Sequence, residues 1–227
     1  MNGVIIVAAG TGSRMNKDIN KQFIKLNNKE IIVHTIDKFY NNNSIDDIVV
    51  VIKESEEEYF INNVIKKYGF DNIKITYGGN ERQDSVHNGI KELDKNCDVV
   101  IVHDGARPFV TDDIIKNSIE EAKKHNAVVV GVKVKDTIKI VGEDGNIIDT
   151  PNRSYLWSVQ TPQVFKYEVI TKAYEDAYNG NYYGTDDAML VERIGYNVKM
   201  IEGSYDNIKI TTQEDLKFGE QILKNKN

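Results

Sequence analysis

The 227-residue chain holds one cysteine and three prolines, and it has no long hydrophobic run. The single Cys97 excludes an internal disulfide framework and fits a reducing compartment. No stretch approaches the roughly 18 consecutive apolar residues that a membrane span needs. The first residues have the pattern of a strand, without the basic and then apolar segments of a secretory signal. We therefore expect a cytoplasmic protein that does not enter a membrane.

An excess of positive charge is also missing, because the formal net charge is −6. Bulk attraction to nucleic acid is therefore not expected, and an anionic substrate would need basic residues gathered locally. The chain shows no repeat, low-complexity tract or linker, and its hydrophobic content of 40% is enough for one sizeable core. We expect a single domain over residues 1–227.

Short runs rich in Val and Ile alternate with helical patterns through the first 134 residues. Strands are expected at 3–9, 46–52, 72–77, 98–104 and 127–134. Helices are expected at 30–40, 54–69, 82–93 and 111–125, the last with Thr111 as N-cap. The strands are apolar almost throughout, which is typical of strands buried on both faces. The alternation predicts an α/β fold, a Rossmann-like domain with a mostly parallel sheet flanked by helices.

The alternation stops at residue 134, and residues of about 134–156 form two β-like runs around the turn sequence GEDGN. We expect a protruding β-hairpin arm there. A lone two-stranded hairpin cannot bury its own apolar side chains, which are Ile138, Ile140, Val141, Ile147 and Ile148. A second copy of the chain would cover them, so we expect a homodimer that exchanges arms.

The remaining residues predict helices at 166–178 and 186–195, a strand near 197–202, and an extended segment at 207–211. A last helix is expected from about residue 212. Thr211 followed by Glu214 fits a capping box at its start.

The first strand runs into a glycine loop, AAGTGSRM at residues 8–15. The loop is not the dinucleotide fingerprint, because Met15 stands where the third glycine is needed, and the P-loop spacing is missing. Small residues still let backbone N–H groups approach an anion. Arg14 and Lys21 follow, and two cations favour a polyphosphate whose charge increases during reaction. The alternative is a tight strand-to-helix turn with solvated cations.

Further polar residues lie where a ligand is expected in an open α/β sheet. Asp104 ends an apolar strand and is either a Mg²⁺ ligand or a capping residue. Gly78 and Gly79 could let backbone groups read the edge of a base, whereas Asp84 is better explained as a helix cap. The four histidines have no metal-ligand spacing. No nucleophile motif is found, which favours direct in-line transfer over a covalent intermediate.

Eight stretches together resemble the family of 2-C-methyl-D-erythritol 4-phosphate cytidylyltransferases, enzymes of non-mevalonate isoprenoid biosynthesis. They are AAGTGSRM, KQF, GGNERQDSV, VHDGARPF, DTIK, RSYLWSVQTPQVF, TDDAMLVE and NIKITTQEDL. Their order and spacing agree with the family from the first strand to the last helix. One departure is Asn20, where the family usually has proline before the lysine, so we expect a more flexible loop at Lys21.

The resemblance implies that CMP passes from CTP to 2-C-methyl-D-erythritol 4-phosphate, with release of pyrophosphate and need for Mg²⁺ or another divalent cation. Arg14, Lys21 and Lys209 would stabilise charge in the transition state. The residues implied to bind CTP are Ala8, Ala9, Gly10, Thr11, Gly12, Gly79, Asn80 and Ser85.

The resemblance also assigns the sugar phosphate and the metal. The residues implied to hold the sugar phosphate are Arg107, Thr137, Arg153, Thr161 and Thr185, with Thr137 and Arg153 supplied by the arm of a partner subunit. Asp104 is the implied metal ligand and Asp206 a weaker one.

Three other functions remain open at this point. The nearest is a cytidylyltransferase for another polyol phosphate, such as ribitol 5-phosphate. A nucleotide-binding regulator without turnover is disfavoured, because simple binding does not need both Arg14 and Lys21. A Rossmann oxidoreductase is disfavoured by the missing third glycine.

Overall fold

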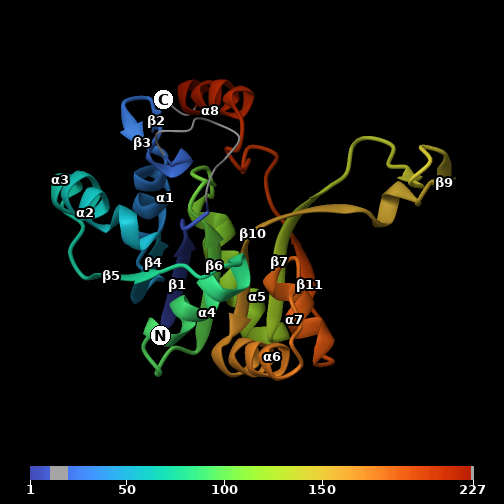
Figure 1. Cartoon of the computed structure of the whole chain (residues 1–227), viewed down its shortest axis with the longest axis horizontal. Helices are drawn as coiled ribbons and strands as arrows, with labels where there is room; N and C mark the ends of the chain where they lie inside the picture. Colours follow the sequence, from blue (N-terminus) through green and yellow to red (C-terminus); the bar gives the residue numbers. More distant parts are fainter. Residues whose placement is uncertain (11–19, 226–227) are drawn as a thin grey trace.

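The computed structural model describes residues 1–10 and 20–225, and in these a seven-stranded sheet forms the centre of the molecule (Figure 1). Its strands lie in the order β11-β7-β10-β6-β1-β4-β5. Their bounds are β1 Asn2–Val7, β4 Asp47–Ile52, β5 Ile73–Tyr77, β6 Val99–Asp104, β7 Ala127–Lys133, β10 Trp157–Lys166 and β11 Lys199–Glu202. All neighbours are parallel except β10, which runs antiparallel to β6 and β7. The predicted α/β fold with a mostly parallel sheet is confirmed.

Helices cover both faces of this sheet. They are α1 Ile31–Tyr40, α2 Glu57–Phe60, α3 Lys66–Tyr68, α4 Arg82–Glu92, α5 Asp112–His125, α6 Tyr167–Asn179, α7 Asp187–Arg193 and α8 Gln213–Asn225. A π-helical segment, η3 Ile61–Ile65, joins α2 to α3 within the helix expected at 54–69. No helix of the described residues has the length and apolar character needed to cross a membrane.

The alternation of side chains along each strand divides the core into two layers. In β1, Val4 and Ile6 face a layer that includes side chains of α1, α2 and α5. Ile5, between them, faces a second layer built with α4, α6 and α7. A third, smaller cluster places α8 over the short hairpin β2 Lys25–Leu26 and β3 Lys29–Glu30. The strands are therefore buried on both faces, as their continuous apolar sequences predict.

Two local features differ from the sequence-based expectations. The ten-residue strand β10 was not predicted, because WSVQTPQVFK mixes polar residues with a proline and has a register irregularity between Val159 and Gln163. The capping box of α8 lies one residue later than expected. The amide of Asp215 donates to Thr212 Oγ1 and the amide of Thr212 donates to the Asp215 carboxylate, so the pair Thr211 and Glu214 was wrong.

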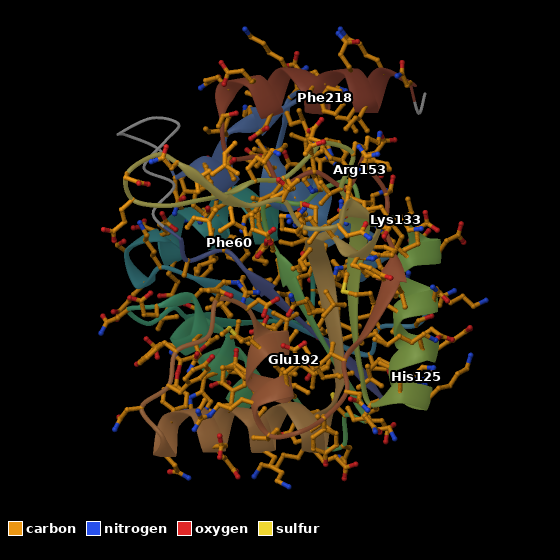
Figure 2. The ribbon with its side chains drawn as sticks, turned by 90° about the vertical axis from the view of Figure 1, so that its right-hand side faces the viewer. Phe60, His125, Lys133, Arg153, Glu192 and Phe218 are labelled. Carbon is orange, nitrogen blue, oxygen red and sulfur yellow. The ribbon has the colours of Figure 1, made fainter. Side chains whose placement is uncertain are left out.

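The predicted arm projects away from the body of the molecule (Figure 1). Its hairpin consists of β8 Ile140–Val141 and β9 Ile147–Asp149. Gly145 has a φ of +81°, which a side chain would disfavour, and it closes the turn between the strands. Figure 2 views the molecule from the side of the arm and places Arg153 in the same upper half as Phe218 of α8. This half also holds the carboxyl ends of the parallel strands (Figure 1).

Candidate active site

A cleft of about 490 Å³ opens at the carboxyl ends of β1, β4, β5 and β6. This size is typical of small-molecule sites, and the carboxyl edge is where open α/β sheets bind ligands. Nine of the predicted site residues line it, namely Ala8, Ala9, Gly10, Lys21, Gly79, Asn80, Ser85, Asp104 and Lys209. Three further predicted residues, Thr11, Gly12 and Arg14, lie outside the described residues. The fold therefore brings together segments that are up to 200 residues apart in the chain.

Asp104, the last residue of β6, lies at the centre of a cluster of cations. Its Oδ2 is 2.8 Å from Lys209 Nζ and 3.4 Å from Arg107 Nε, and its Oδ1 is 3.7 Å from Arg82 Nε. Burial alone would raise the pKa of Asp104, but these three cations outweigh it and hold the pKa well below its ordinary value. The carboxylate is therefore ionised at neutral pH.

A second buried carboxylate, that of Asp187, lies on the other side of Arg82 from Asp104. Arg82 Nη2 donates to its Oδ2 at 2.9 Å, and the hydroxyl of Tyr174 donates to its Oδ1 at 2.6 Å. Arg82 thus lies between Asp104 and Asp187, which hold its pKa above the ordinary value despite burial. The sequence analysis gave Arg82 no role. Its position at the first turn of α4 was the only sequence signal, since the partner Asp187 is 105 residues away.

The start of the glycine loop packs closely against the loop after β5. A Cβ on Gly78 would collide with the side chain of Ala9, so glycine is required where the two loops meet. Beside it, Ser85 Oγ accepts from the amide of Gly79 at 3.2 Å. Asp84 forms a capping box with Glu81 at the start of α4, which confirms the capping assignment of Asp84. These contacts fix the wall of the cleft formed by Gly79, Asn80 and Ser85.

Lys21 begins the short 3₁₀ helix η1 Lys21–Phe23, which is attached to the rest of the fold at both ends. The side-chain amide of Gln22 donates to the carbonyl of Ala8. Phe23 is buried, and its ring centroid lies 4.8 Å from that of Tyr59 in α2. Asn20 has φ −63° and ψ 136°, a conformation open to proline as well. The expected flexibility of this loop stays a prediction.

The remaining predicted residues lie outside the wall of this cleft as the described residues define it. Arg107 and Thr161 support Asp104, because Arg107 pairs with its carboxylate and Thr161 Oγ1 accepts from its amide at 3.0 Å. Thr185 is exposed just before α7, and Asp206 is exposed on the loop before Lys209. The exposed arm carries both of the remaining residues, Thr137 and Arg153. Their roles stay predictions.

The sequence analysis missed Lys53, which follows β4 and also lines the cleft. Among the described residues no ion pair of Lys53 is found. The available signal was a lysine directly after a buried strand, comparable to the aspartate that ends β6, but an isolated lysine is most often solvated.

Asp104 offers a carboxylate oxygen to a magnesium ion in the cleft. Within residues 1–10 and 20–225, no group of three or more His, Cys, Asp or Glu side chains is arranged to hold a metal. Among the described residues, the two shortest ion pairs of Asp104 use Oδ2, whereas Oδ1 lies 3.7 Å from Arg82 Nε. Mg²⁺ commonly takes one or two carboxylate oxygens and completes its shell with substrate phosphates and water. The residues therefore fit a metal that arrives with a nucleotide.

Comparison with known proteins gives one consistent result. Residues 3–225 match the model of the 2-C-methyl-D-erythritol 4-phosphate cytidylyltransferase family. The enzyme of that name from Clostridioides difficile is 65% identical over 223 residues, which are 98% of this chain and 94% of that protein. The one from Alkaliphilus metalliredigens is 50% identical, over 97% of this chain and 92% of its own. The crystal structure of 4-diphosphocytidyl-2C-methyl-D-erythritol synthase from Anaerococcus prevotii superposes with a TM-score of 0.87 at 35% identity, covering 98% of both chains.

Proposed function

This chain belongs to the 2-C-methyl-D-erythritol 4-phosphate cytidylyltransferase family, and from that premise we propose how its residues carry out the reaction. The enzyme transfers CMP from CTP to 2-C-methyl-D-erythritol 4-phosphate in non-mevalonate isoprenoid biosynthesis. The observation that carries the proposed mechanism is the convergence of Lys21, Lys209 and Asp104 with the glycine loop in one cleft.

The chemistry needs alignment and charge neutralisation more than proton transfer. A phosphate oxygen of the sugar phosphate attacks the α-phosphorus of CTP, and the bond from that phosphorus to the bridging oxygen of the β-phosphate breaks. Pyrophosphate leaves with the electron pair, and the CDP-alcohol remains. The attacking phosphate is already an anion, so no general base is required and no covalent enzyme intermediate forms.

The cations of the cleft have separate parts in this step. We assign Lys21, and with it Arg14, to the triphosphate, where they stabilise the charge that grows on the pyrophosphate. Lys209 is held by Asp104 at 2.8 Å, so its ammonium group is fixed in direction before substrate binds. The wall formed by Gly79, Asn80 and Ser85 takes the cytosine and ribose, and its backbone groups are fixed by the contacts at the start of α4.

Asp104 would hold a divalent cation through Oδ1. When bound, such an ion neutralises phosphate oxygens and helps to orient the triphosphate. Asp206 stays the weaker ligand of the two, because it lies exposed three residues before Lys209.

We further propose that the single catalytic domain acts as a homodimer in the cytoplasm, where CTP is made and a free thiol such as Cys97 persists. The apolar arm supports the dimer. Ile147 is 60% exposed and Ile148 is 70% exposed, which is unfavourable for an isolated hairpin in water. An exchanged arm would bury them and bring Thr137 and Arg153 toward the sugar phosphate in the partner's cleft, where Arg107, Thr161 and Thr185 are the implied contacts of this chain.

The Lys21→Ala variant tests the mechanism. A contact that strengthens in the transition state affects kcat, so kcat should fall by roughly 10²–10³-fold with little change in the KM for CTP. Steady-state pyrophosphate release measures both constants. A change confined to KM would reduce Lys21 to a residue that binds the ground state.

A further inference from the structure

Asn20, the residue directly before Lys21, contacts an acidic residue of the neighbouring 3₁₀ turn, η2 Glu54–Glu56. Its side-chain amide Nδ2 donates to Glu56 Oε1 at 2.7 Å, across 36 residues of sequence. This length lies within the usual range of an N–H···O hydrogen bond. The contact therefore links the start of η1 to the segment that leads into α2.

The side chain of Asn20 does not cap the helix η1 that follows it. Asn20 is the N-cap of η1, and asparagine is among the best N-cap residues because its side chain can accept from the helix amides. Here it makes no such bond, although its backbone carbonyl accepts from the amide of Phe23 at 2.9 Å. The side chain is directed to Glu56 instead.

The link is partly buried. The other oxygens of the two side chains, Asn20 Oδ1 and Glu56 Oε2, are buried and accept no hydrogen bond from the described residues. A hydrogen bond in such surroundings is stronger than the same bond in water, and it restricts the two side chains to one arrangement. The neighbouring Glu58 offers a contrast, because it lies two residues later, in α2, and is exposed.

Glu56 thus completes the attachment of η1. Gln22 attaches the segment to the carbonyl of Ala8 at the end of β1, and Phe23 packs on Tyr59. Both of these contacts follow Lys21 in sequence. Asn20 and Glu56 provide the attachment that precedes it. Removing that attachment would loosen the described segment directly before Lys21.

We propose that Glu56 is a positioning residue, which holds Lys21 in its catalytic place through the side chain of Asn20. The inference rests on the proposed function of Lys21 in phosphate chemistry. Misplacing a catalytic group by about 1 Å can lower a rate by as much as 10²-fold, and the loss of one of the several attachments around Lys21 should have a smaller effect. We expect about a tenfold fall in kcat.

The test compares four variants by steady-state kinetics with CTP and 2-C-methyl-D-erythritol 4-phosphate. Glu56→Ala and Asn20→Ala should each lower kcat about tenfold and leave the KM for CTP within about twofold. Glu56→Gln keeps an oxygen that accepts from Asn20 and should restore kcat nearly to the wild-type value. Glu58→Ala, the matched control, should leave kcat unchanged.

A double variant shows whether the effect passes through Lys21. In Lys21→Ala, which already lacks the ammonium group, adding Glu56→Ala should not lower kcat further. A second tenfold loss would overturn the proposal, as would a Glu56→Gln variant as slow as Glu56→Ala, or an effect on KM alone. The melting temperature of each variant distinguishes a general loss of stability from a misplaced Lys21, which should leave the melting temperature unchanged. An inactive wild-type enzyme would refute the proposed function, whereas an active wild type with an unaffected Glu56→Ala would refute only this inference.

Discussion

Lys209 Nζ lies 2.8 Å from Oδ2 of Asp104, so an ion pair joins the segment before α8 to the end of β6 across 105 residues of sequence. The pair has two consequences for the cleft. It aims the ammonium group of Lys209, and it leaves Oδ1 of Asp104 as the oxygen that the proposed metal ion would use. Both consequences depend on the same carboxylate, which makes Asp104 the most informative residue to change.

Asp104→Asn should lower kcat by about 10²-fold and raise the Mg²⁺ concentration needed for half-maximal activity. The amide has no charge to hold Lys209 and is a poor ligand for Mg²⁺. Activity measured over a Mg²⁺ titration, beside a thermal melt, checks this. An unchanged Mg²⁺ midpoint, with activity and melting temperature falling together, would make Asp104 a structural residue.

Lys53→Met should raise the KM for CTP several-fold and leave kcat close to the wild-type value. Lys53 lines the cleft, and no ion pair holds it within the described part of the chain. Its ammonium is thus available to the nucleotide in the ground state, and uniform binding affects KM. Lys25→Met, which removes an exposed lysine of β2, is the control and should change neither constant. A fall in kcat for Lys53→Met would instead place Lys53 among the catalytic cations.

If the subunits exchange arms, two different inactive variants should restore activity when they are mixed. When Arg153→Ala protein is mixed with Lys21→Ala protein, each heterodimer should regain one intact site. Random pairing then gives about a quarter of wild-type activity. Sedimentation confirms the dimer, and subunit exchange is followed with differently tagged chains. Proven exchange without recovery of activity would show that Arg153 does not serve the partner's site.

The fold and most of the cleft could be predicted from the sequence because their signals are local. Buried parallel strands are apolar almost throughout, and their carboxyl ends carry Asp104 or lead into the loops with Gly10 and Gly79. Strand β10 could not be predicted, since its polar residues are explained only by their partners in the fold. Gln163, for example, donates to Asp186 and accepts from the amide of Ala188.

The ion pairs within the site could not be predicted from the sequence either. The resemblance implies that Arg107 holds the sugar phosphate, and in the structure Arg107 also pairs with the carboxylate of Asp104. Arg82 carried no signal beyond its type, because the buried carboxylate that it contacts belongs to α7. The contact of Arg82 depends on how α4 and α7 meet, which neither spacing nor hydrophobic periodicity encodes.

The central claim is that this cleft transfers CMP to 2-C-methyl-D-erythritol 4-phosphate. The most direct measurement is pyrophosphate release from CTP and Mg²⁺ by the purified protein, with 2-C-methyl-D-erythritol 4-phosphate and ribitol 5-phosphate compared at matched concentrations. We predict turnover with the first substrate at a kcat/KM at least about 10²-fold above that for the second. An equal or higher kcat/KM for ribitol 5-phosphate, or no pyrophosphate with either, would contradict the account.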